Sequence, residues 1–154
     1  MDFMLSIKLA ATLANLGEFT HSVFKWLRSY DVSQKQIMSI ELALEEALVN
    51  VCRYAYKEQT GDVEVRCIAE SNDRFLIEII DSGTPFDVCS VPVPDLKACI
   101  AERKIGGLGI HFIKKMATNI EYCRKDGFNV LSLTFQSAPD QTTKMVTLRH
   151  NTGH

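Results

Sequence analysis

The sequence predicts an α/β (α+β) two-layer sandwich, in which a mixed, mainly antiparallel sheet carries helices on one face. Alternating apolar residues indicate strands, two pairs of which are close enough in the chain to form hairpins. Other segments have the apolar spacing of amphipathic helices. The resulting order is strand, helix, helix, strand, strand, loop, helix, strand, strand. A chain of 154 residues can bury a core as one domain of ordinary size.

The first part of the chain predicts one strand followed by two helices. "FMLSIKLA", at residues 3–10, alternates loosely and predicts a strand. Residues 12–29 have helical apolar spacing and predict the first helix. A capping box from Ser33 to Gln36 opens the second helix, which we expect to run to about Tyr56 before a turn.

The remaining strands are predicted as two hairpins. The first pairs residues 62–70 with residues 74–80. The second pairs residues 119–125 with residues 128–135 across an Asp-Gly turn at 126–127. Between the hairpins, residues 87–105 contain prolines and little periodicity, so we expect a long loop that acts as a lid over a ligand. The domain is expected to span residues 1–137 and to be followed by a polar tail at 138–154.

Composition favours a cytoplasmic protein. Apolar residues make up 46% and the formal net charge is −2, which gives no electrostatic reason to expect a nucleic-acid partner. The five cysteines are scattered without C-x-x-C or zinc spacing, so we interpret them as reduced thiols. The first residues lack the pattern of a signal peptide, and no stretch is long and apolar enough to span a membrane.

The stretch "EEALVN", at residues 45–50, places an asparagine inside a predicted helix. Asparagine has low helix propensity because its side chain competes for backbone hydrogen bonds. On a helical wheel, Glu46 and Asn50 lie together, with Arg53 and Tyr54 nearby, while Glu45 points elsewhere. They lie roughly opposite the apolar stripe expected to face the sheet, which comprises Ile37, Ile40, Leu44, Leu48, Val51 and Ala55. The pair is either solvated helix surface or a site. In a site, the carboxylate accepts a proton or orients a nucleophile, and the amide oxygen binds Mg²⁺.

Two further motifs have both a plain and a functional interpretation. Asp81-Ser82-Gly83 is either a turn or a site where Asp81 accepts a hydrogen bond from an exocyclic amine and Gly83 admits a flat ligand. The segment "GGLG" is either a connector or a phosphate site, because it feeds backbone N–H groups into a helix start. It consists of Gly106, Gly107, Leu108 and Gly109. Arg103 and Lys104 add positive charge just before it.

Together, these motifs resemble the superfamily of gyrase, heat-shock chaperone, histidine kinase and mismatch-repair ATPases. Within it, the sequence is most similar to the anti-sigma factor serine/threonine-protein kinases. Those kinases have a pattern like E-A-x-x-N-A-x-x-H-[AG]-Y, and this chain reads "EALVNVCRYAY" at residues 46–56. Residues 81–83 match the D-x-G box, and "ERKIGGLGI" at 102–110 matches the second glycine box. The resemblance covers roughly residues 3–137. One departure is Tyr54, which stands where these kinases usually have histidine.

The resemblance implies a Bergerat ATP-binding fold with ATP and Mg²⁺ as cofactors. It implies a kinase that phosphorylates a serine or threonine of a small antagonist protein, binds a sigma factor in partner switching, and forms a homodimer. In that scheme Glu46 is the general base or orienting group and Asn50 holds Mg²⁺. Asp81 binds the adenine amine, and Thr134 on the last strand contacts the same edge through water.

Two other functions remain open at this point. A non-enzymatic switch module would bind ATP and a regulatory partner without transferring phosphate, and Tyr54 is the residue that favours it. An ATPase module of the same kind would instead serve another signalling output, such as a phosphatase partner. His21 and His111 are both interpreted as structural, because neither lies in the setting of a phosphoacceptor histidine.

Overall fold

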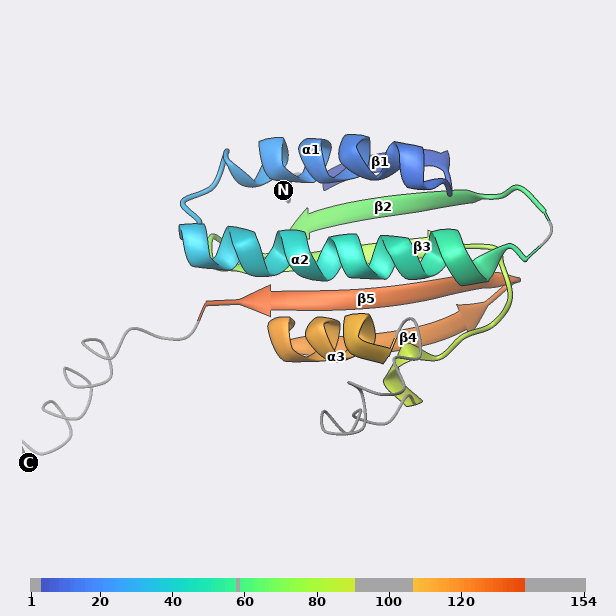
Figure 1. The fold of residues 1–154 in the computed structure, drawn as a ribbon. Helices are drawn as coiled ribbons and strands as arrows, with labels where there is room; N and C mark the ends of the chain where they lie inside the picture. The colour runs from blue at the N-terminus through green and yellow to red at the C-terminus, as the bar shows by residue number, and fades with distance from the viewer. Residues whose placement is uncertain (1–3, 58, 91–106, 138–154) are drawn as a thin grey trace, which may run out of the picture.

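The computed structural model describes residues 4–57, 59–90 and 107–137. In this part of the chain, a five-stranded sheet carries α1, α2 and α3 on one face (Figure 1). The strand order is β1-β2-β3-β5-β4, and every pairing is antiparallel. The strands are β1 (Met4–Ala10), β2 (Asp62–Ala69), β3 (Arg74–Asp81), β4 (Asn119–Lys125) and β5 (Phe128–Gln136). The predicted two-layer fold is therefore confirmed, and the observed ladders are antiparallel throughout.

The helices also follow the predicted order. The α-helices are α1 (Leu16–Leu27), α2 (Gln34–Asn50) and α3 (Gly107–Met116). A 3₁₀ turn at Leu13–Asn15 leads into α1, and a π-helical turn at Val51–Ala55 extends α2. The side chain of Ser33 accepts a hydrogen bond from the Gln36 N–H at 3.1 Å, so the predicted cap forms. Within the described residues, no helix has the length and apolarity needed to cross a bilayer.

One face of the sheet is apolar because inward and outward side chains alternate along each strand. Cys67, Ile77 and Leu133 form one row across three strands, and all are fully buried beneath the helices. On the reverse face, Arg66 and Glu78 lie side by side in register. The hairpin between β4 and β5 turns at Asp126 and Gly127, both with positive φ, as the Asp-Gly pair predicted.

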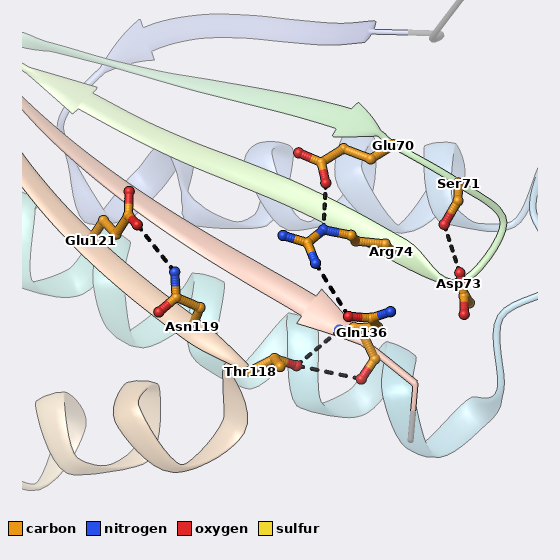
Figure 2. Close-up of polar contacts among 8 residues, drawn as sticks. All are labelled: Glu70, Ser71, Asp73, Arg74, Thr118, Asn119, Glu121 and Gln136. Carbon is orange, nitrogen blue, oxygen red and sulfur yellow. Dashed lines mark hydrogen bonds and ion pairs between the residues drawn. The ribbon is translucent and has the colours of Figure 1, made fainter. Parts of the chain in front are cut away.

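Polar contacts join the strand ends farthest from the β3 C-terminus (Figure 2). Arg74 donates from Nε to Glu70 at 2.5 Å and from Nη1 to the side-chain oxygen of Gln136 at 3.3 Å. The backbone N–H of Gln136 donates to the Thr118 hydroxyl at 2.9 Å. These exposed contacts contribute little stability individually, but they fix the register of β3 and β5 at this end.

The helix α2 lies between α1 and α3 in the helical layer (Figure 1). The predicted stripe faces the sheet, but Ala43, Ala47 and Asn50 are buried as well. The helical wheel was therefore wrong to place Asn50 on the side away from the core. The wheel considered only the sheet as a neighbour, whereas α3 packs along this flank of α2.

The four described cysteines are free thiols, as expected. Cys67 lies in the core, and its burial raises the pKa of its thiol to about 12. Cys89 and Cys123 are exposed. Cys99 and the tail at 138–154 lie outside the described residues.

Candidate functional site

Several element ends meet at one side of the molecule. The C-terminal ends of α2 and β3, the start of β5 and the start of α3 all lie there (Figure 1). A cavity of about 40 Å³ opens among the first three of these ends. Its lining includes the polar side chains of Asn50, Tyr54, Asp81, Thr84, Tyr122 and Asn129. Ile79 and Leu131 from the sheet supply part of its apolar wall.

Asp81 is the last residue of β3, and the alternation of that strand turns its side chain toward the helices. Its exposed fraction is only 7%. One carboxylate oxygen, Oδ1, accepts hydrogen bonds from the Gly83 N–H and the Asn129 Nδ2, both at 2.9 Å. The second oxygen, Oδ2, has no hydrogen bond within the described part of the chain. Asp81 lines the cavity, so this oxygen is available to accept a hydrogen bond from a ligand bound there.

Gly83 is required by a close approach between two backbone segments. A Cβ at this position would lie 2.3 Å from the carbonyl oxygen of Ala55. The next residue, Thr84, donates its backbone N–H to that same oxygen at 2.8 Å. The D-S-G loop is thereby tied to the end of the π-helical turn. The structure therefore explains the glycine by a contact with the chain's own backbone. Its role in admitting a flat ligand stays a prediction.

Tyr56 fastens the same loop from the other side. Its hydroxyl donates to the Asp62 carbonyl oxygen at 2.6 Å and accepts the Ser82 backbone N–H at 2.9 Å. The chain leaving the π-helical turn, the start of β2 and the end of β3 are therefore joined through one phenol group. This arrangement holds Asp81 at a fixed distance from the end of α2.

Asn50 ends the regular part of α2 and is only 8% exposed. Its side-chain nitrogen, Nδ2, is buried and has no hydrogen-bond partner among the described residues. Buried side-chain amides in folded proteins are nearly always paired, so an unpaired one requires an explanation. The π-helical turn that follows Asn50 is a feature often found at functional sites. Asn50 and Asp81 share the cavity without bonding to each other, as ligand-binding groups do.

Glu46 lies one turn before Asn50, beside the first turn of α3. A Cβ on Gly109 would lie 2.4 Å from the Oε2 of Glu46, so glycine leaves room for this carboxylate. A carboxylate is favoured near a helix N-terminus because the unpaired N–H groups there carry partial positive charge. Gly107 is the first residue of α3, and Leu108 follows it, as the glycine motif predicted. The structure thus places Glu46, one helical turn before Asn50, beside the start of α3.

Thr134 lies outside the cavity, so the prediction that it contacts a bound base was wrong. It sits on the β5 face opposite the helices, paired with Leu76 and Asn119 near the far end of the sheet. The β5 residue directly opposite Asp81 is Asn129. Asn129 was missed because its position depends on the pairing of β3 with β5, which no local sequence pattern indicates. Tyr122, on β4, was missed for the same reason.

Other predicted residues fall outside what the structure describes. Lys104 and Gly106 are among them, as is most of the expected lid, residues 91–105. The first residues of that segment form a 3₁₀ turn, Val88–Ser90. Val88 is buried and lines the cavity, so the start of the expected lid belongs to the core.

The chain matches one family model and is similar in sequence to several known proteins. The family model described as histidine kinase-like ATPase domain matches residues 9–135. The chain is 26% identical to the serine/threonine-protein kinase BtrW of Bordetella bronchiseptica over 102 residues, which cover 66% of this chain and 72% of that kinase. It is 27% identical to the serine-protein kinase RsbW of Bacillus cereus over 99 residues, covering 62% of this chain but only 61% of the relative.

A solved structure gives the same architecture. The crystal structure of the RsbU and RsbW domains of a Mycobacterium tuberculosis protein superposes with a TM-score of 0.64. The match covers 89% of this chain and 33% of that one, at 17% sequence identity. At this identity the likeness concerns the fold alone.

Two glycine substitutions should have different consequences. We expect Gly83→Ala to lower the stability by about 2 kcal/mol or more, because the new methyl group meets a backbone carbonyl that is held by a hydrogen bond. Gly109→Ala should leave the stability nearly unchanged, because Glu46 can move its flexible carboxylate aside. Denaturant unfolding of both variants measures the difference. Equal losses of stability would contradict the backbone contact assigned to Gly83.

Proposed function

We propose, because this chain belongs to the family of histidine kinase-like ATPase domains, that it binds ATP and transfers the γ-phosphoryl group to a serine or threonine of a partner protein. The observation that carries the proposal is the buried Asp81, whose Oδ2 is unpaired within the described residues and lies in the lining of a cavity. Two relatives, BtrW and RsbW, are named as protein kinases, which supports the same activity. ATP is the phosphoryl donor in this proposal.

The cavity suits the base of the nucleotide. Oδ2 of Asp81 is an acceptor, and the exocyclic amine of adenine is a donor, so the two are complementary. Ile79 and Leu131 offer apolar surface to the flat ring, and the exposed Phe86 borders the opening. The enclosed volume holds only about three water molecules, so the base would displace water and widen the opening.

The phosphates are assigned to the region between α2 and α3. Backbone N–H groups at Gly107–Gly109, in the first turn of α3, suit phosphate oxygens. Gly106 and Lys104 extend this part of the proposal to residues just before α3. No group of three or more His, Cys, Asp or Glu side chains among the described residues is placed to hold a metal ion. A Mg²⁺ ion would therefore rely on the side-chain oxygen of Asn50 and on the phosphates, as Mg²⁺ commonly does.

The unpaired Nδ2 of Asn50 fits a bound phosphate oxygen, which would accept its hydrogen bond and remove the cost of its burial, while the side-chain oxygen of the same amide would face Mg²⁺. Bound Mg²⁺ would neutralise charge on the phosphates during transfer. Glu46 is the general base or orienting group of the proposal. It takes the proton of the substrate hydroxyl as that oxygen forms a bond to the γ-phosphorus. The bond between the γ-phosphorus and the bridging oxygen breaks, and ADP leaves.

The partner proteins in this proposal are inferred from the family that the chain resembles. The resemblance to the anti-sigma factor serine/threonine-protein kinases suggests a small antagonist protein as the phosphorylated substrate and a sigma factor as the second partner. A homodimer and a cytoplasmic location belong to the same proposal. Tyr54 lines the cavity where related kinases usually carry histidine. This observation keeps a second candidate, an ATP-binding switch that engages a regulatory partner without phosphate transfer.

Nucleotide affinity should depend on Asp81. Asp81→Asn replaces an acceptor oxygen with a donor group, which mispairs with the amine of adenine. A mispaired buried group costs about 1–3 kcal/mol, or roughly a ten- to hundredfold loss of affinity. Titration calorimetry with Mg·ATP measures this change. Unchanged affinity in a folded Asp81→Asn protein would remove Asp81 from the site.

Substitutions of Glu46 and Asn50 should affect ATP affinity and the rate of phosphoryl transfer differently. We expect Glu46→Gln to keep ATP affinity within about a few-fold, since the change is nearly isosteric, and to slow transfer by around 10²-fold or more. Asn50→Ala should weaken Mg²⁺-dependent ATP binding as well as transfer. Labelled ATP and candidate antagonist proteins provide the transfer assay, and calorimetry provides the affinity.

Glu45→Gln is the matched control, because the neighbouring Glu45 is exposed and points away from the cavity. It should be nearly neutral in both assays. An inactive Glu45 variant beside an active Glu46 variant would contradict the assignment. If wild-type protein binds ATP and transfers phosphate to no partner, the non-enzymatic switch is the better description.

A further inference from the structure

We infer that Asn129, held in place by Tyr122, is a positioning residue that leaves Asp81 one free acceptor and so selects 6-amino over 6-oxo purine nucleotides. This inference rests on the proposed function, because it concerns the nucleotide bound by the same cavity. The proposed nucleotide site assigns no role to Asn129 or Tyr122. Both line the cavity, and both come from the β4–β5 hairpin rather than from the helices or the D-S-G loop.

The donors of Asn129 are fully used. Its Nδ2 donates to Oδ1 of Asp81 at 2.9 Å and to the carbonyl oxygen of Thr84 at 3.0 Å. A side-chain amide has two N–H donors, so these two bonds exhaust them. The first bond, together with the Gly83 N–H, occupies Oδ1 of Asp81 and holds the plane of its carboxylate. Only Oδ2 of Asp81 then remains for a ligand.

The orientation of the Asn129 amide follows from its partners. If the amide were flipped, its oxygen would face a carboxylate oxygen and a carbonyl oxygen, and three acceptors would meet without a proton between them. The observed orientation instead presents the oxygen of Asn129 to the hydroxyl of Tyr122, which donates at 2.6 Å. Tyr122 therefore fixes which end of the amide reaches Asp81.

A second hairpin residue supports the same loop. Arg124 donates from Nη1 to the carbonyl oxygen of Gly83 at 2.7 Å. The loop after β3 is thus held by the hairpin on one side and by the π-helical turn on the other. Asn129 is the one of these contacts that touches the carboxylate of Asp81 directly, so it bears on ligand choice rather than on loop position alone.

The chemical consequence is selectivity at one atom of the base. A 6-amino purine presents a donor to Oδ2, whereas a 6-oxo purine presents an acceptor and leaves two oxygens facing each other. With Oδ1 occupied and its plane held, Asp81 cannot turn to avoid this clash. When Asn129 is removed, the carboxylate can rotate and water can enter beside it, so a 6-oxo base meets less repulsion.

The test compares the binding of ATP with that of inosine triphosphate, which has oxygen in place of the 6-amino group. Calorimetry in the presence of Mg²⁺ gives both dissociation constants for each protein. We expect wild type to prefer ATP, and Asn129→Ala to reduce that preference by about tenfold. Tyr122→Phe removes only the hydroxyl that orients Asn129, so the preference should fall in the same direction by a smaller factor.

Asn119→Ala is the matched control, because it makes the same change on β4 at an exposed side chain whose bond, at 3.3 Å, is to Glu121 (Figure 2). It should keep the wild-type preference. Equal weakening of both nucleotides in the Asn129 and Tyr122 variants would indicate a merely structural role and overturn the inference. If Asn129→Ala does not fold, the preference of Tyr122→Phe decides.

The outcomes also separate this inference from the proposed function. Wild-type protein that binds ATP and inosine triphosphate equally well overturns the inference and leaves ATP binding intact. Wild-type protein that binds neither nucleotide overturns the proposed function, and the inference falls with it.

Discussion

The buried carboxylate of Asp81 is the constraint on which the site depends. A charged group with so little exposure requires donors, and here one comes from its own loop and one from the neighbouring strand. The bond to the Gly83 N–H curls the loop after β3 back over the end of the strand. That curl brings Thr84 to the carbonyl oxygen of Ala55 and so joins the sheet to the end of α2. Asn50 lies five residues before Ala55, in the same short stretch of helix, and reaches the cavity as a result.

The site keeps polar groups that folding alone does not satisfy. Nδ2 of Asn50 is a buried donor without a partner, and Oδ2 of Asp81 is an acceptor without one in the described part of the chain. The two line the same cavity without bonding to each other. A sequence selected for stability alone would pair or replace such groups. Their retention at the meeting point of α2, β3 and β5 is the physical basis for placing a ligand there.

Much of this arrangement is predictable from local sequence patterns. Alternation along β2, β3 and β5 determines which residues face the helices, and Asp81 follows from that alternation. The Asp-Gly turn and the Ser33 cap set the ends of a hairpin and a helix. Local sequence patterns do not indicate which distant strands pair. For this reason the prediction missed Asn129 and wrongly placed Thr134 at the site. The burial of Asn50 was also missed, because a helical wheel omits the flank that α3 covers.

We propose that the cavity between Asn50 and Asp81 binds the adenine nucleotide. A crystal structure of the protein with Mg²⁺ and a non-hydrolysable ATP analogue tests it most directly. We expect the exocyclic amine of adenine within hydrogen-bonding distance of Oδ2 of Asp81, with the Asn129 bond to Oδ1 retained. We also expect the side chain of Asn50 to contact the Mg²⁺ ion or the phosphates. A base bound away from Asp81, or an Asn50 amide that remains unpaired beside the bound analogue, would show that this cavity is not the nucleotide site.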